Sequence, residues 1–169
     1  MTSFPFRFEL LDATHDRTQF CCGEDVLDRY LQTQATQDMR RRVANCFVAI
    51  EAVAGKIAAY YTLSAASIPL MDLPADETKR LPRYPTLPAV RIGRLAVDQR
   101  FQGRGLGAAL LMNAVDRTLR ADAAAFALLV DAKDDRAVGF YRHYGFRTLV
   151  SRPRTLFLPL KTAQQVFHQ

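Results

Sequence analysis

Alternating or continuous runs of apolar residues predict most of the strands of the fold. Residues 6–10 alternate apolar and charged side chains, which is typical of a strand with one buried face. Two β-rich runs, 45–51 and 57–63, flank Gly55 and predict an antiparallel hairpin. The other apolar runs predict strands over residues 90–97, 124–130, 146–150 and 155–160.

Apolar residues at helical spacing predict three helices. The first covers about 24–42, with acidic residues in its first turns and three arginines in its last, as the helix dipole favours. The second covers about 105–120. The third covers 135–144 and is followed by Gly145, the residue type expected just past a helix C-terminus.

Residues 66–89 separate the hairpin from the next strand. They contain five prolines, which exclude a regular helix or a central strand across most of the segment. The sequence therefore predicts a long loop here, and a loop of this length inside a compact domain is more often functional than idle. The predicted elements, without repeat or linker, make one α+β domain over residues 1–169.

Composition narrows the class of protein. Of 169 residues, 49% are hydrophobic and 24% charged, which are ordinary globular values. No stretch approaches the ~20 apolar residues of a membrane span. The first residues do not combine a basic leader with a long apolar run, so we expect no secretory signal. Three cysteines, two of them adjacent (Cys21 and Cys22), suit neither a disulfide framework nor a zinc site. We therefore expect a cytoplasmic protein without membrane contact and without a metal.

The positive charge is concentrated in one segment. The whole chain has a net charge of +6, and residues 79–104 contain seven basic residues against the single acid Asp98. Six of the seven are arginine, whose planar guanidinium can bind phosphate with two parallel hydrogen bonds. A basic run is often only a solvated face, but this one flanks a glycine-rich loop, which favours a polyanionic ligand.

That loop, residues 102–107, reads Gln-Gly-Arg-Gly-Leu-Gly and lies between a predicted strand and a predicted helix. Glycines let the backbone approach a ligand closely, and a helix N-terminus presents unpaired N–H groups, so the loop is suited to a pyrophosphate. A P-loop is excluded because alanines, not Lys-Ser/Thr, follow Gly107. A dinucleotide fingerprint is formally met by Gly103, Gly105 and Ala108, but it follows about four strands and its candidate acid, Asp131, comes late.

Two motifs resemble those of the GNAT acyl-CoA N-acetyltransferases. Residues 91–111, with Gln102, Gly105 and Gly107, match the family's motif Gln/Arg-x-x-Gly-x-Gly/Ala, and residues 134–146 match its Ala-x-x-Phe-Tyr-x-x-x-Gly-Phe motif. The resemblance implies a GNAT-like α+β fold with a mixed, mostly antiparallel twisted sheet flanked by helices on both faces. It also implies acetyl-CoA as co-substrate and no metal.

The resemblance assigns roles to particular residues. Tyr141 would be the general acid for the leaving thiolate. Asp134, at the start of the second motif, joins the cofactor-binding set. The backbone of Leu95, Ala96 and Val97 would pair with pantetheine, and the pyrophosphate would be held by the amides of Gln102, Gly103, Arg104, Gly105, Leu106 and Gly107.

The absence of a general base from one strand bears on which kind of amine can accept the acetyl group. Residues 90–97 contain no carboxylate that could act as a strong general base. A lysine amine, with a pKa of about 10.4, is almost wholly protonated at neutral pH, whereas an α-amine, with a pKa of about 7.7–8.0, is far easier to deprotonate. The site is therefore better suited to an α-amine, although a relayed water could also act as base.

Further segments resemble the GNAT toxins of bacterial toxin–antitoxin pairs. They are residues 20–31, Gln34 and Ala35, 60–63, and 84–98. The chain differs from these toxins in two small ways. It has two cysteines, Cys21 and Cys22, before the glycine where one is commoner, and it has Tyr30 at a position where tryptophan is also usual. The resemblance implies acetylation of the α-amine of the amino acid on charged tRNA, which blocks translation. It also implies a ribbon-helix-helix antitoxin and a homodimer.

Arginines of the basic segment 79–104, extended by those at 40–42, are the expected contacts to tRNA phosphates. The candidates are Arg40, Arg41, Arg83, Arg91 and Arg94. We expect loss of charge at Arg83 or Arg91 to weaken tRNA acetylation without affecting acetyl-CoA binding. Two alternatives stay open: a GNAT N-acetyltransferase of a small amine, drug or protein N-terminus, and an inert acyl-CoA-binding or DNA-regulatory module.

Overall fold

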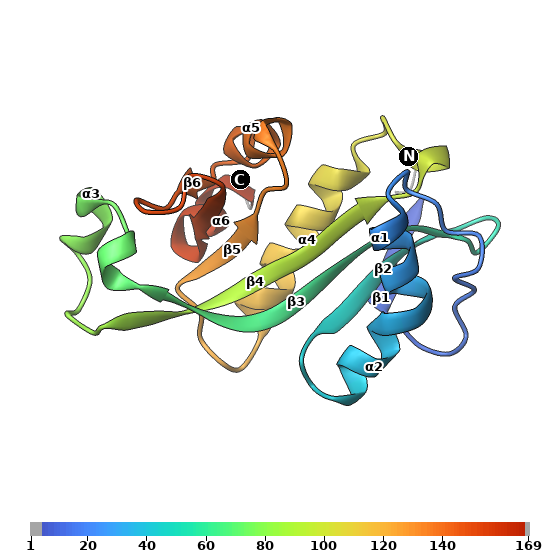
Figure 1. The fold of residues 1–169 in the computed structure, drawn as a ribbon, viewed down its shortest axis with the longest axis horizontal. Helices are drawn as coiled ribbons and strands as arrows, with labels where there is room; N and C mark the ends of the chain where they lie inside the picture. The colour runs from blue at the N-terminus through green and yellow to red at the C-terminus, as the bar shows by residue number, and fades with distance from the viewer. Residues whose placement is uncertain (1–4, 168–169) are drawn as a thin grey trace. The chain divides into compact units, whose positions relative to one another are not determined.

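A computed structural model describes residues 5–167 of the chain (Figure 1). Its strands are β1 (Phe6–Leu10), β2 (Asn45–Glu51), β3 (Ile57–Pro69), β4 (Thr86–Val97), β5 (Ala127–Asp131), β6 (Arg147–Thr148) and β7 (Thr155–Pro159). They are hydrogen-bonded in the order β1-β2-β3-β4-β5-β7-β6. β4 and β5 are parallel, whereas β1–β2, β2–β3, β5–β7 and β6–β7 are antiparallel. The mixed, mostly antiparallel sheet predicted from the sequence is confirmed.

The helical elements connect these strands. The α-helices are α1 (Asp25–Arg29), α2 (Ala35–Arg40), α3 (Ala75–Thr78), α4 (Leu106–Arg120), α5 (Asp135–His143) and α6 (Leu160–Phe167). A π-helical turn, η1 (Tyr30–Gln34), joins α1 to α2, and two 3-10 turns are η2 (Leu70–Asp72) and η3 (Gln99–Phe101). Among residues 5–167 no helix is both long and apolar enough to cross a membrane.

The residues of the chain contact one another mainly within two compact units, which we describe in turn. The first comprises residues up to Ser64 together with 93–113, and the second comprises 65–92 together with the chain from Ala114 onwards.

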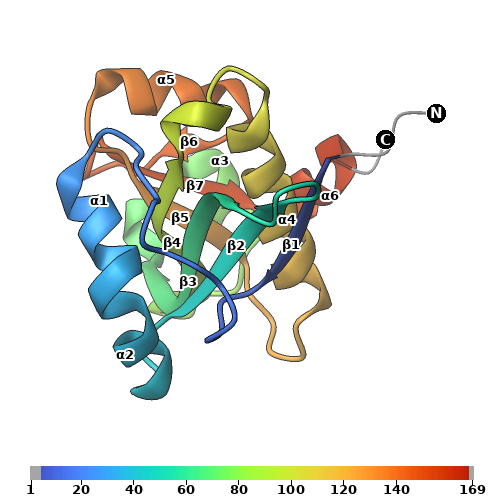
Figure 2. The ribbon, with the colours of Figure 1, turned by 90° about the vertical axis from the view of Figure 1, so that its right-hand side faces the viewer.

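Two adjacent tyrosines show how helices cover both faces of the sheet in the first unit. The Tyr60 hydroxyl donates to the Leu27 carbonyl oxygen of α1 at 2.7 Å, and the Tyr61 hydroxyl donates to Asn113 of α4. Successive side chains of a strand point to opposite faces. Therefore α1 and α4 lie on opposite faces of β3, as Figure 2 shows.

The helix predicted over 24–42 contains an irregularity. At η1 the Ala35 N–H donates to the Tyr30 carbonyl five residues earlier, which is the π-helical pattern. This wider turn lets Tyr30, Leu31 and Ala35 all be buried on the side that packs against the sheet. Regular α-helical structure ends at Arg40, two residues earlier than predicted. The core that covers this face consists of Leu11, Phe20, Tyr30, Leu31, Ala35, Cys46, Val48, Ile50, Ile57, Tyr60 and Ala96.

The second unit is built around β5. Residues 127–130 of this strand are completely buried, and they pair in parallel with 89–92 of β4 and antiparallel with β7. A strand covered on both faces is expected to be apolar throughout, as Ala-Leu-Leu-Val is here. The core of this unit consists of Ile68, Leu73, Leu87, Ala89, Ala127, Leu129, Leu149 and Phe157.

The prediction of a loop over 66–89 is wrong for much of that segment. β3 continues to Pro69, η2 and α3 follow, and β4 already begins at Thr86. The prolines are accommodated because they occupy positions that need no N–H donor: Pro69 ends β3 and Pro74 precedes the first turn of α3. Pro88 lies inside β4, where its carbonyl accepts a hydrogen bond from Phe126 N–H at 2.8 Å.

The C-terminal elements also differ from the prediction. The strand predicted over 146–150 is only two residues long, and the strand predicted over 155–160 ends at Pro159. The helix α6 follows at once, with Leu160 and Ala163 buried between exposed polar residues. The sequence analysis did not predict this helix, because eight residues are too few to show a clear helical period of apolar positions.

Candidate active site

The glycine-rich loop follows β4 and η3 in the first unit and leads into the first turn of α4. Gly103 and Gly105 have φ angles of 79° and 76°, in the left-handed region that L-residues seldom adopt. A Cβ atom at either position would meet nothing within 4 Å, so backbone conformation, not space, requires glycine there. The loop is exposed, and the unpaired N–H groups of α4's first turn lie beside it. This arrangement fits the diphosphate that the sequence predicted.

Asp98 anchors the loop, a role that the sequence did not reveal. Its side chain is 1% exposed, and its carboxylate accepts hydrogen bonds from Cys21 N–H at 3.0 Å and from Arg100 N–H at 2.9 Å. The Arg100 side chain donates twice more, from Nε at 2.9 Å and Nη2 at 3.0 Å. Burial alone would raise the pKa of Asp98, but the hydrogen bonds from Arg100 and Cys21 outweigh it and hold the pKa below its usual value.

Gln102 closes the loop with its side chain. Its Nε2 donates to the carbonyl oxygens of Val97 at 3.0 Å and Cys22 at 3.2 Å. The Cys21 carbonyl accepts in turn from Gln99 N–H at 2.8 Å. The Cys21–Cys22 segment is therefore bound to the loop at several points. Gln102 was predicted as a backbone donor, and its side chain adds a structural contribution that the motif did not indicate.

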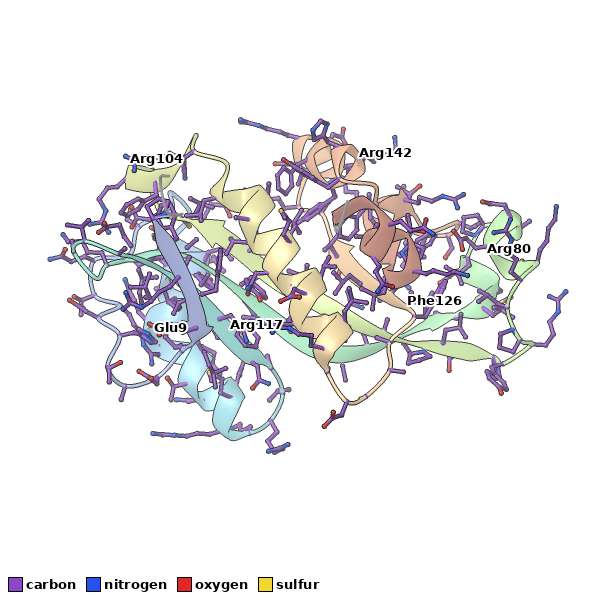
Figure 3. All side chains as sticks on the ribbon, turned by 180° about the vertical axis from the view of Figure 1, so that it is seen from behind. Glu9, Arg80, Arg104, Arg117, Phe126 and Arg142 are labelled. Carbon is purple, nitrogen blue, oxygen red and sulfur yellow. The ribbon has the colours of Figure 1, made fainter. Side chains whose placement is uncertain are left out.

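Arg104 supplies a cation at the loop. Its side chain is exposed on the segment before α4, as Figure 3 shows. Its guanidinium lies 5.5 Å from the centroid of the buried Phe101 ring, and that of Arg100 lies 5.6 Å from the same ring. Because Arg100 is held by Asp98, Arg104 is the better placed of the two to receive an anion.

Tyr141 lies on α5 in the second unit. Its ring packs edge-to-face against Phe140 and Phe146, with centroids 5.2 and 5.4 Å away. The residue is 9% exposed, and burial raises the pKa of its hydroxyl to about 12. Among residues 5–167 no hydrogen bond partner engages that hydroxyl. The phenol is thus fully protonated at neutral pH and able to donate.

Local capping fixes α5. The Asp134 carboxylate accepts from Ala137 N–H at 2.8 Å and caps the N-terminus. Gly145, with a φ of 96°, ends the helix, and Phe146 N–H donates to the Tyr141 carbonyl at 3.2 Å. Asp134 therefore has a structural role, and its assignment to cofactor binding stays a prediction. The assignment of Leu95–Val97 to cofactor binding also stays a prediction. These residues extend β4 beyond residues 89–92, which pair with β5.

The predicted tRNA-binding arginines fall into two groups. Arg40 and Arg41, at the end of α2, and Arg83, between α3 and β4, are exposed. Arg91 forms an ion pair with Asp131, and the Arg94 guanidinium lies 3.6 Å from the centroid of the Tyr30 ring. Arg91 and Arg94 thus have partners within the protein, so their contact with RNA stays a prediction. Among the described residues, no group of three or more His, Cys, Asp or Glu side chains could hold a metal ion.

Both sequence motifs of the candidate site lie in a region that matches a known protein family. A family model described as an acetyltransferase (GNAT) domain matches residues 80–155, which include both the glycine-rich loop and Tyr141. The class that the fold and the two motifs define is that of the acyl-CoA-dependent N-acetyltransferases.

Individual relatives narrow the class. A tRNA-acetylating toxin of Mycobacterium tuberculosis is 35% identical over 151 residues, which cover 88% of this chain and 89% of the toxin. A structure of AtaT complexed with acetyl-methionyl-tRNAfMet has a TM-score of 0.86 and 30% identity, covering 96% of this chain and 99% of that chain. A mutant AtaT bound to the C-terminus of the antitoxin AtaR and acetyl-CoA has a TM-score of 0.80 and 27% identity, covering 98% and 100%. The chain belongs to the GNAT acetyltransferases, in the family of the tRNA-acetylating toxins.

Proposed function

We propose that this protein transfers the acetyl group of acetyl-CoA to the α-amine of the amino acid on charged tRNA and thereby blocks translation as a toxin. The observation that carries the proposal is the likeness over 88% of the chain to a tRNA-acetylating toxin. The AtaT structure with acetyl-methionyl-tRNAfMet, at a TM-score of 0.86, supports the same substrate. Residues 1–169 would form one GNAT domain.

The glycine-rich loop is suited to hold the diphosphate of the acyl donor. Its left-handed glycines bend the backbone just before α4, whose first N–H groups have no partner within the helix, and the exposed Arg104 adds a positive charge. Asp98 and Gln102 fix the loop in this conformation before any ligand binds. The backbone of Leu95–Val97 lies beyond the residues of β4 that pair with β5, which supports its assignment to pantetheine.

Tyr141 is suited to protonate the leaving sulfur. Acetyl-CoA supplies the acetyl group as a thioester. The amine nitrogen forms a bond to the carbonyl carbon, the carbon–sulfur bond breaks, and Tyr141 donates its phenolic proton to the departing sulfur. The amine loses one proton to water, and the phenolate regains one from solvent. Because burial keeps the phenol protonated, this donor is available throughout the pH range in which an α-amine loses its proton.

The exposed arginines are suited to the phosphates of the RNA. Arg40, Arg41 and Arg83 offer unhindered guanidinium groups, which bind phosphates without regard to sequence. Arg91 and Arg94 would contribute mainly through their charge, because each already has a partner in the protein.

The likeness to AtaT also suggests protein partners for this chain. AtaT binds the antitoxin AtaR in a neighbouring structure. We infer a matching antitoxin for this chain, of the ribbon-helix-helix type, together with a homodimer and action in the cytoplasm, where charged tRNA is found.

The test uses the purified protein with labelled acetyl-CoA and aminoacylated tRNA. We expect label on the aminoacyl group, and little transfer when free amines or amino acids replace tRNA. The Tyr141→Phe variant should bind acetyl-CoA but transfer label at least a hundredfold more slowly. Rapid labelling of small amines with no labelling of tRNA would show the alternative, a small-molecule N-acetyltransferase.

A further inference from the structure

The end of α2 is formed by an arginine in an unfavourable backbone conformation. Arg42 has a φ of 60°, and among the described residues it is the one non-glycine residue with a positive φ. Arg42 N–H donates to the Met39 carbonyl at 3.1 Å, and Val43 N–H donates to the Asp38 carbonyl at 2.9 Å. This pair of hydrogen bonds is a Schellman motif, in which the left-handed position is usually glycine.

The helix dipole does not explain this arginine. Cations near a helix C-terminus are favoured, which accounts for Arg40 and Arg41 in ordinary conformations. At Arg42, however, glycine would remove the steric strain of a left-handed L-residue, and the two preceding arginines would still complement the dipole. Strain of this kind is found where a side chain serves another purpose. The Arg42 side chain is exposed, so that purpose lies at the surface.

A hollow of about 300 Å³ lies beside the last turns of α2, with Thr36, Met39 and Arg40 in its lining. Its lining combines apolar residues, two arginines, one acid and one threonine: Leu11, Ala13, Met39, Arg17, Arg40, Asp12 and Thr36. The Arg17 guanidinium donates to the carbonyls of Leu31 at 3.3 Å and Asp12 at 3.4 Å, which fixes its plane. The volume is at the lower end for ligand pockets, about 300–1,000 Å³.

We propose that the end of α2 and this hollow form a subsite for one unstacked nucleotide of the RNA substrate. The phosphate contacts Arg42, and the base enters the hollow between the apolar atoms and the fixed guanidinium of Arg17. Proteins commonly bind single-stranded RNA by inserting a base against apolar or guanidinium surfaces while arginines hold its phosphate. An acidic peptide would use the cations but would leave the apolar floor without a partner. The inference rests on the proposed function and adds to it a binding site for one nucleotide of the RNA, separate from the loop assigned to the acyl donor.

The first test measures binding of uncharged tRNA to the full chain at several salt concentrations. We expect Arg42→Gly to raise Kd about three- to tenfold and to lower the slope of log K against log salt by about 0.7–0.9, the loss of one phosphate contact. Its melting temperature should not fall, because glycine relieves the strain. Arg42→Lys keeps the charge and should bind nearly as the wild type does. Arg7→Gln removes the same charge from an exposed position on β1 and should leave Kd within twofold.

The second test fills the hollow. Ala13 lines it and is exposed, so Ala13→Phe should weaken tRNA binding without lowering the melting temperature. Wild-type Kd and salt slope in both Arg42→Gly and Ala13→Phe would overturn the subsite. Acetyl transfer by the wild type to charged tRNA is measured alongside. If transfer is intact and the variants bind normally, the subsite alone fails. If the wild type transfers nothing to tRNA, the proposed function fails and the subsite loses its ligand.

Discussion

The buried carboxylate of Asp98 accepts a hydrogen bond from Cys21 N–H, 77 residues earlier in the chain. The same carboxylate binds the backbone and the guanidinium of Arg100. One side chain thus holds the N-terminal segment against the loop that leads to α4.

The first prediction concerns Asp98→Asn. An amide can keep one or two of these hydrogen bonds but not the charge-assisted pair with Arg100, so we expect a loss of about 1–3 kcal/mol in the free energy of unfolding at pH 7. The pKa of Asp98 is lowered in the folded protein, so its contribution is present above the unfolded value of about 3.9 and is lost as pH falls through the lower folded value. The gap between wild type and variant should therefore narrow below about pH 4 in denaturation curves. A gap that stays constant into acid would contradict this role.

The second prediction concerns the left-handed glycines of the loop. Gly103→Ala and Gly105→Ala should each cost about 1–2 kcal/mol in stability and raise the Kd for acetyl-CoA, because the N–H groups would turn away. Gly55→Ala is a matched control: its φ is 70°, and a Cβ there also meets nothing within 4 Å, but it lies in the β2–β3 turn. The control should lose similar stability and keep its affinity for acetyl-CoA in calorimetry. Equal affinity in all three variants would remove the loop from the binding site.

The third prediction concerns Tyr141→Phe. The hydroxyl has no hydrogen bond partner among residues 5–167, so stability should change little, whereas kcat should fall about 10²–10⁴-fold through loss of the general acid. Because the pKa of Tyr141 is about 12, the wild-type rate should rise as the α-amine deprotonates near pH 8 and should show no decline from loss of the phenolic proton below pH 10. Tyr144→Phe, on the next turn, serves as control with nearly normal kcat. A similar loss in both variants would argue against the assigned role.

The fourth prediction separates the two substrates. Arg83 is exposed between α3 and β4, and Arg83→Gln should raise the KM for charged tRNA severalfold, most strongly at low salt, while the Kd for acetyl-CoA stays the same. Arg91→Gln is a less simple variant because it leaves Asp131 without its ion-pair partner, so Arg91→Gln with Asp131→Asn is the better comparison. Equal losses for both substrates would contradict this division between the arginines.

Sequence patterns predicted the parts of the site that are local in the chain. The glycine-rich loop before a helix follows from the motif, and so does the helix that carries Tyr141 and is followed by Gly145; the left-handed conformation of Gly103 and Gly105 is known only from the structure. The links between distant segments were not predictable: nothing in the residues near Asp98 indicates Cys21 as its partner. For the same reason the arginines could be counted but not assigned, because the Tyr30 ring under Arg94 and the Asp131 carboxylate beside Arg91 are brought there by tertiary packing.

The π-helical turn at Tyr30–Gln34 sets the direction in which the end of α2 faces. Each residue advances an α-helix by about 100°, so deleting one residue from this turn would rotate α2 by that angle against the buried Leu31 and Tyr30. Arg40 and Arg42 would then swing about a quarter of the way around the helix axis, and the buried Ala35 would turn out of the core. This one π-helical turn thus determines the orientation of the arginines at the end of α2 relative to the buried residues that precede it.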